Sequence, residues 1–152
     1  MSGRIAYESP VGLLEILSEG NSLTVIRKFE PISADKDFSE DDITRETERQ
    51  LREYFSGKRT AFDLPVSPRG TDFRRAVWNV LLKIPYGETR SYSDIASAAG
   101  KLSAQRAVGN AIGDNPILIV IPCHRVIRSD GGMGGFSAGI DMKKFLLGLE
   151  GH

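Results

Sequence analysis

Cysteine and histidine are nearly absent from this chain of 152 residues, which has one cysteine and two histidines. A single cysteine, Cys123, excludes an intramolecular disulfide. Together with His124 and His152 it supplies too few thiol and imidazole ligands for a Cys/His zinc site. We therefore expect no metal and no cofactor, and a lone free thiol favours a reducing compartment.

The chain also lacks a long apolar segment and an excess of either charge. No stretch has the form of an export signal or of a membrane span, so we expect a soluble cytoplasmic protein that does not bind membranes. Lys and Arg together equal Asp and Glu, at 20 each. Residues 1–63 contain nine basic and thirteen acidic residues, whereas residues 64–152 contain eleven and seven. The second half is thus the better candidate to bind an anion such as DNA.

Two prolines and a glycine interrupt the sequence at residues 64–70, without any periodic apolar pattern. This predicts a linker between a first domain of residues 1–63 and a second of residues 71–152. A charged helix is expected to begin at Ser39 and to end at Gly57. Before it, alternating apolar residues predict three strands, Arg4–Ser9, Leu13–Leu17 and Leu23–Phe29. The first domain is therefore a small sheet with a covering helix, and it contains no catalytic cluster.

The second half has the pattern of helices. Thr71 is a predicted cap for an amphipathic helix whose apolar positions continue to Ile84. Ser91 opens a capping box and a short helix that stops at Gly100. Ser103 is the expected cap of a third helix. A short helix, a glycine turn and a second helix predict a helix-turn-helix unit.

The third helix has two contrasting sides. Its expected buried side comprises Ala104, Ala107, Val108 and Ala111. Its opposite side has little bulk and comprises Arg106, Gly109, Asn110 and Gly113. Such a surface suits close approach to a DNA minor groove, with one long side chain entering the base stack. Tight helix packing with a solvated arginine is the alternative.

Cys123 follows the apolar run Ile117–Ile121, which we expect to be a strand, and stands between Pro122 and His124. The basic Arg125 indicates that the chain leaves the interior here. A thiol placed beside a rigid proline and an imidazole is where we expect the chemistry.

Seven short motifs follow one another in the second half: Tyr86-Gly87-Glu88, Ser91-Tyr92, Arg106-Ala107-Val108-Gly109, Asn115-Pro116, Ile121-Pro122-Cys123-His124-Arg125-Val126, Gly135-Phe136-Ser137 and Leu146-Leu147-Gly148-Leu149-Glu150-Gly151. In this order they closely resemble the O6-alkylguanine-DNA alkyltransferases, or methylated-DNA–protein-cysteine methyltransferases. The resemblance is strong over residues 70–151 and weaker over residues 1–63. It implies an α+β fold: a ribonuclease-H-like sheet-plus-helix domain, then a mainly helical domain with a winged-helix-like helix-turn-helix.

The resemblance also implies an activity. The protein would bind double-stranded DNA as a monomer, with cooperative binding left open, and flip out O6-alkylguanine. It would transfer the alkyl group, methyl best, irreversibly to its own Cys123.

Roles for individual residues follow from the same resemblance. His124 would be the base for the Cys123 thiol, acting through a water, and Glu150 would orient the imidazole. Tyr92 would donate a proton to the guanine and contact phosphate, and Asn115 would brace the site. The implied substrate-binding residues are Val126, Phe136 and Ser137. The implied DNA-binding residues are Ser91, Ser103, Ala104, Gln105, Arg106 and Gly109.

Two residues depart from the family's usual pattern, Gln105 in place of a small residue and Phe136 in place of tyrosine. Three other classes stay open. A cysteine hydrolase would turn over and would need an oxyanion hole. A silent damage sensor of this architecture would have the cysteine replaced, and a regulatory helix-turn-helix module would leave Cys123 unmodified.

Overall fold

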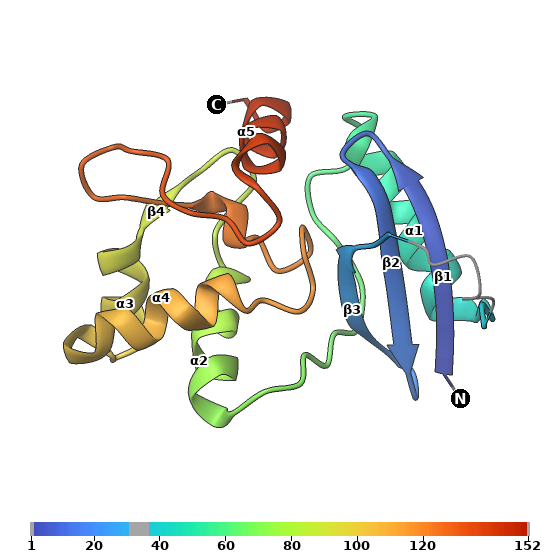
Figure 1. The fold of residues 1–152 in the computed structure, drawn as a ribbon, viewed down its shortest axis with the longest axis horizontal. Helices are drawn as coiled ribbons and strands as arrows, with labels where there is room; N and C mark the ends of the chain where they lie inside the picture. The colour runs from blue at the N-terminus through green and yellow to red at the C-terminus, as the bar shows by residue number, and fades with distance from the viewer. Residues whose placement is uncertain (1, 31–36, 152) are drawn as a thin grey trace. The chain divides into compact units, whose positions relative to one another are not determined.

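The computed structural model describes residues 2–30 and 37–151. The chain divides into two compact units, Met1–Pro68 and Arg69–His152 (Figure 1). The first contains an antiparallel sheet and one helix, and the second is mainly helical. The predicted α+β class is therefore confirmed. No helix in the described ranges is long and apolar enough to cross a membrane.

The first unit is a meander of three antiparallel strands with one helix. Strands β1 (Ser2–Ser9), β2 (Gly12–Glu19) and β3 (Ser22–Lys28) pair in chain order. Helix α1 (Asp42–Phe55) packs against the sheet (Figure 1). Buried Leu and Ile side chains of β2 and β3 and buried Leu51 and Tyr54 of α1 form the core. Burial of this apolar surface stabilises the layer pair.

Helix α1 begins three residues later than predicted. Its N-cap is Asp41, whose carboxylate accepts a hydrogen bond of 2.8 Å from the Thr44 N–H. Ser39 instead exchanges two backbone hydrogen bonds with Arg4 of β1. Because that pairing holds the Ser39 backbone extended, the helix starts after it.

Residues 65–67, within the predicted linker, run beside β3. The Leu23 N–H donates to the Pro65 carbonyl at 2.8 Å, and the Ser67 N–H donates to the Leu23 carbonyl at 2.9 Å. These bonds give the edge of β3 backbone partners.

The second unit is built on α2 (Asp72–Leu81), α3 (Tyr92–Ala98), α4 (Gln105–Gly113) and α5 (Ile140–Leu149). Two-residue strands β4 (Arg90–Ser91) and β5 (Val126–Ile127) pair in parallel. Helices α2, α3 and α4 pack against one another. The Trp78 Nε1–H on α2 donates to the Ala111 carbonyl on α4 at 2.8 Å. This bond fixes α4 against α2.

Two of the three predicted caps in this unit are correct. Thr71 caps α2, and Ser91 and Asp94 form a capping box at α3, with both hydrogen bonds at 3.0 Å. The predicted cap at Ser103 is wrong, because Ser103 lies inside a 3-10 turn, Leu102–Ala104, and α4 follows without a side-chain cap. The tight turn, closed by the Ala104 N–H on the Lys101 carbonyl at 2.9 Å, occupies the expected first residues of the helix.

The buried stripe of α4 also differs from the prediction. Val108, Ala111 and Ile112 are buried, whereas Ala107 is exposed and Ala104, which precedes α4, is only partly buried. These three residues have the i, i+3, i+4 spacing of a packed helix face. The buried face of α4 therefore includes Ile112 in place of the predicted Ala107.

Residues Ile117–Ile121 are buried but do not form the expected strand. They fold into a compact turn in which the Ile121 N–H donates to the Ile117 carbonyl at 3.0 Å. Ile119 adopts a positive φ of 73°, which is rare for a β-branched residue. A short apolar run does not distinguish a strand from other buried backbone.

Candidate active site

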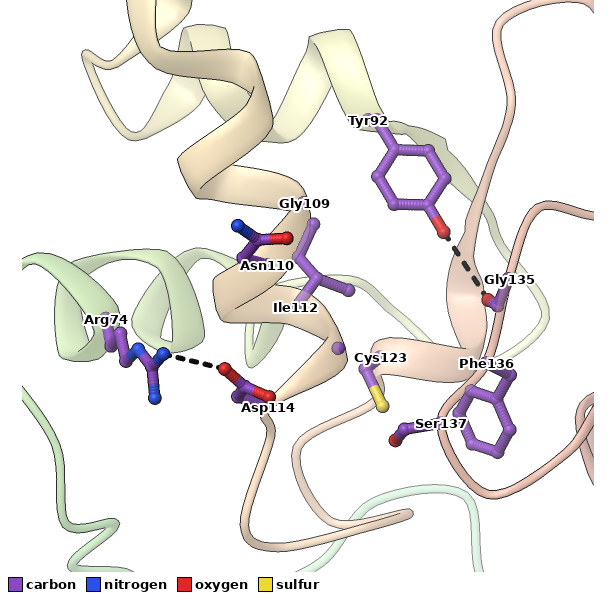
Figure 2. Close-up of a pocket in the computed structure, with 11 residues that line it drawn as sticks. Arg74, Tyr92, Gly109, Asn110, Ile112, Asp114, Cys123, Gly135, Phe136 and Ser137 are labelled. Carbon is purple, nitrogen blue, oxygen red and sulfur yellow. Dashed lines mark hydrogen bonds and ion pairs between the residues drawn. The ribbon is translucent and has the colours of Figure 1, made fainter.

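A pocket of about 540 Å³ opens on the second unit beside α4. Figure 2 shows Cys123 at its centre, with Tyr92 and the segment 135–137 on one side and α4 on the other. The residues that line it are Arg74, Tyr92, Gly109, Asn110, Ile112, Gly113, Asp114, Cys123, Gly135, Phe136 and Ser137. Five of the residues predicted for the site or for DNA binding are therefore brought to one cavity.

Cys123 lies in the 3-10 turn Cys123–Arg125 and is only 3% exposed. The Asn115 side chain donates through Nδ2 to the Cys123 sulfur at 3.0 Å and to the Ile121 carbonyl at 2.7 Å. Its Oδ1 accepts the Ile117 N–H at 2.9 Å. Asn115 is thus held at both ends and presents a donor to the sulfur.

The environment of Cys123 keeps it a thiol in the free protein. Burial raises its pKa to about 11, against the opposing effects of the Asn115 hydrogen bond and the Lys143 charge. A protonated thiol is a weak nucleophile. The site therefore has to remove a proton when it reacts.

His124 and Glu150 form a fully buried pair. The imidazole Nε2 lies 2.7 Å from Glu150 Oε2. Because an ionised carboxylate only accepts, Nε2 carries the hydrogen. His124 Nδ1 is buried and has no hydrogen-bond partner among residues 2–30 and 37–151. Burial lowers the His124 pKa although the neighbouring Glu150 raises it, so the ring is neutral with Nδ1 as its acceptor.

Arg125 is part of the same network, a role that was not predicted from the sequence. Its Nε donates to Glu150 Oε1 at 2.7 Å, its Nη2 to Glu150 Oε2 at 3.0 Å and its Nη1 to the Ile84 carbonyl at 2.7 Å. The residue is buried, so the chain does not leave the interior at Arg125 as predicted. The paired charges explain how a guanidinium is tolerated there.

Lys143 on α5 was also missed. Its Nζ donates to the Val126 carbonyl at 2.6 Å and to the Gly135 carbonyl at 3.1 Å. Burial lowers its pKa to about 8, with Cys123 acting in the opposite direction. A signal was present, because Lys143, Leu146 and Leu147 have the i, i+3, i+4 spacing of a buried face.

Tyr92 is the first residue of α3 and its ring reaches the pocket. Its hydroxyl lies 3.4 Å from the Gly135 carbonyl (Figure 2). Burial raises its pKa, so the phenol is protonated at neutral pH. Gly134, at a φ of 72°, lies against this ring, and a Cβ there would stand 3.0 Å from two Tyr92 atoms.

The remaining predicted residues fall into three groups. Phe136 and Ser137 line the pocket, and Val126 is buried with its carbonyl bound by Lys143. Gln105 and Arg106 are exposed at the start of α4. Ser103 is also exposed, Ala104 and Ser91 are partly buried, and the Ser91 hydroxyl is engaged in the α3 cap.

The glycines of α4 are not required by the packing of the protein. Apart from its chain neighbours and the nearby backbone of α4 itself, a Cβ built at Gly109 or Gly113 would meet no atom within 4 Å in the part of the chain that the structure describes. Glycine within a helix costs about 0.5–1 kcal/mol relative to alanine. A bare surface that the fold does not need fits the approach of another molecule.

Two family models match the chain. Residues 72–152 match the DNA binding domain of 6-O-methylguanine DNA methyltransferase, and residues 4–68 match its ribonuclease-like domain. The chain belongs to the 6-O-methylguanine DNA methyltransferase family. The predicted resemblance, including the ribonuclease-like first domain, is thereby confirmed.

Individual members of the 6-O-methylguanine DNA methyltransferase family are similar over nearly the whole chain. The methylated-DNA–protein-cysteine methyltransferase of Methanosarcina barkeri is 50% identical over 149 residues, 94% of this chain and 93% of the relative. The crystal structure of the Mycobacterium tuberculosis O6-methylguanine methyltransferase has a TM-score of 0.86 at 44% identity, covering 99% of this chain and 93% of that one. A second M. tuberculosis structure, in complex with DNA, has a TM-score of 0.86 at 45% identity, covering 95% and 90%.

Proposed function

We propose that this protein repairs double-stranded DNA by transferring the alkyl group of O6-alkylguanine, methyl best, to Cys123. The transfer is irreversible and occurs once per molecule. The proposal is carried by one observation: the chain's sole thiol lies in a pocket beside helix α4 and next to a buried His–Glu pair. We further propose that the protein acts in the cytoplasm as a monomer.

The chemical step exchanges one bond for another. The Cys123 sulfur attacks the alkyl carbon, a carbon–sulfur bond forms and the bond from that carbon to guanine O6 breaks. The bond electrons leave with the guanine, which takes up a proton. The products are unmodified guanine and a stable thioether, so the protein is consumed.

The thiol proton leaves through His124. One water would bridge Cys123 to the imidazole Nδ1, the buried acceptor that has no partner in the described chain. Glu150 stabilises the imidazolium that forms, as a carboxylate does in a Ser-His-Asp triad. The resulting thiolate is stabilised by the Asn115 donor at 3.0 Å and by the nearby charge of Lys143.

The leaving guanine is handled by the other side of the pocket. The Tyr92 phenol donates a proton to the purine as negative charge develops on it. Ser137 receives O6, and the carbonyls of Cys123 and Val126 accept the exocyclic amine. Lys143 uses one lone pair of the Val126 carbonyl, which leaves the second for the substrate.

Extrusion of the target base from the duplex gives a role to the exposed residues of α4. A stacked O6-alkylguanine cannot reach a sulfur on a folded domain, so it rotates out of the duplex at a cost of a few kcal/mol. Exposed Arg106 fills the vacated place, and the bare face at Gly109 and Gly113 allows α4 to approach the minor groove.

Mass spectrometry after incubation with an O6-methylguanine duplex tests the proposal. We expect one methylene of added mass on the Cys123 peptide, one equivalent of repaired guanine, and neither product with Cys123→Ser. Product beyond one equivalent would indicate a hydrolase. A repaired strand without the adduct, or DNA binding without repair, would reject the transfer.

A further inference from the structure

Asn110 is an exposed polar residue of the pocket to which the proposed reaction assigns no role. Its side chain lines the same cavity as Cys123. Within residues 2–30 and 37–151 its amide forms no side-chain hydrogen bond. An exposed amide at the mouth of a binding pocket has both a donor and an acceptor available to a ligand.

Helix geometry places Asn110 on the path of the extruded nucleotide. It lies four residues after Arg106, so the two side chains share one face and are separated by about 6 Å along the helix axis. In the proposed reaction Arg106 fills the place that the base leaves, and Cys123 marks where the base arrives. Asn110 lies on α4 between Arg106 and the end of the helix that is nearer to Cys123.

The pocket has chemically different sides. Figure 2 shows Tyr92, Phe136 and Ser137 on one side of Cys123, and Asn110, Asp114 and Arg74 on the other. The first side offers the aromatic and hydroxyl groups that suit a purine. On the second side Arg74 and Asp114 form an ion pair of 2.7 Å, which leaves the Asn110 amide as the polar group without a partner there.

We propose that Asn110 contacts the sugar-phosphate backbone of the extruded nucleotide and positions that nucleotide for attack by Cys123. This inference rests on the proposed function. With the purine against Tyr92 and Phe136, its sugar and phosphate lie at the pocket mouth, where Asn110 is exposed. The amide N–H group donates to a phosphate or sugar oxygen. Asn110 is a positioning residue and takes no part in bond exchange.

The test compares two substrates and three variants. The free base O6-methylguanine needs no extrusion and has no backbone, whereas a duplex that contains the lesion needs both. The variants are Asn110→Ala, Asn110→Asp and the matched control Asn79→Ala, which changes an exposed asparagine of α2 outside the pocket. Single-turnover methylation of Cys123 is measured by mass spectrometry, with melting temperatures to establish folding.

We expect Asn110→Ala to slow methylation from the duplex about fivefold to tenfold, the effect of one lost hydrogen bond. Asn110→Asp should slow it more, since a second carboxylate beside Asp114 repels phosphate. Methylation by the free base should be unchanged in both variants, and Asn79→Ala should match the wild type on both substrates.

Three results would overturn the inference. These are an unchanged duplex rate, equal losses on both substrates, or a loss whose size depends on the flanking base pair, which would mean that Asn110 contacts base edges. If wild-type Cys123 is methylated by neither substrate, it is the proposed function that fails.

Discussion

Arg125 donates two hydrogen bonds, of 2.7 and 3.0 Å, to the Glu150 carboxylate, and an oxygen of the same carboxylate lies 2.7 Å from His124 Nε2. These residues come from the 3-10 turn at Cys123 and from the C-terminal end of α5. The ion pair thus joins the nucleophile turn to the last helix and sets the orientation of the imidazole.

Replacing Arg125 by methionine should destabilise the protein by about 3–5 kcal/mol, because the Glu150 carboxylate would stay buried without its counter-charge. Urea denaturation measures the change. Arg128→Met is the matched control, since Arg128 and Asp130 form an exposed ion pair at 2.9 Å, and such pairs contribute about 0–1 kcal/mol. If both variants lost the same free energy of unfolding, the buried ion pair would contribute no more to stability than the exposed one.

Stability should fall in alkali because of Cys123. Its pKa is raised from 9.0 to about 11 by burial, so hydroxide ionises the unfolded chain before the folded one. The contribution of the neutral thiol is fully present below pH 9 and is lost as pH rises toward 11, by about 3 kcal/mol. Denaturation from pH 8.5 to 11 should show wild type losing stability relative to Cys123→Ser. If the stability of the wild type and of Cys123→Ser changed with pH in parallel, the burial of the thiol would be contradicted.

Replacing Lys143 by methionine should slow alkyl transfer at least about tenfold. The change leaves the Val126 and Gly135 carbonyls without this donor and removes a positive charge that lowers the Cys123 pKa. Single-turnover kinetics and ultraviolet titration of the thiolate measure both effects. Lys144→Met, an exposed neighbour on the same helix, should behave as wild type. A normal rate in Lys143→Met would remove Lys143 from the mechanism.

Replacing Gly134 by alanine should slow transfer by displacing Tyr92. The new Cβ would stand 3.0 Å from the Tyr92 ring, and alanine at this positive φ costs about 1–2 kcal/mol. Gly131→Ala is the matched control, because Gly131 has a φ of 87° with no described atom within 4 Å of its Cβ position. Both variants should lose similar stability, and only Gly134→Ala should lose rate. Equal rates would mean that the Tyr92 position is unimportant.

Local features were predictable where the deciding contacts are local in sequence. The cap at Thr71 and the capping box at Ser91 depend on hydrogen bonds between residues three apart. The three strands of the first unit follow from alternation and from turns of two residues. The seven short motifs of the second half, including the one around Cys123, are likewise continuous in sequence, and their order predicted the family.

The residues that only the tertiary structure revealed are those whose environment comes from distant segments. Arg125 is buried because Glu150, 25 residues away, docks beside it, and Lys143 is buried because two carbonyls from other segments meet its ammonium group. Residues Ile117–Ile121 form a turn because Asn115 bonds their backbone in place of a neighbouring strand. The sequence tells which side chains in these segments are apolar and which are charged. Which partner compensates a buried charge or an unpaired backbone group is decided only when the chain packs.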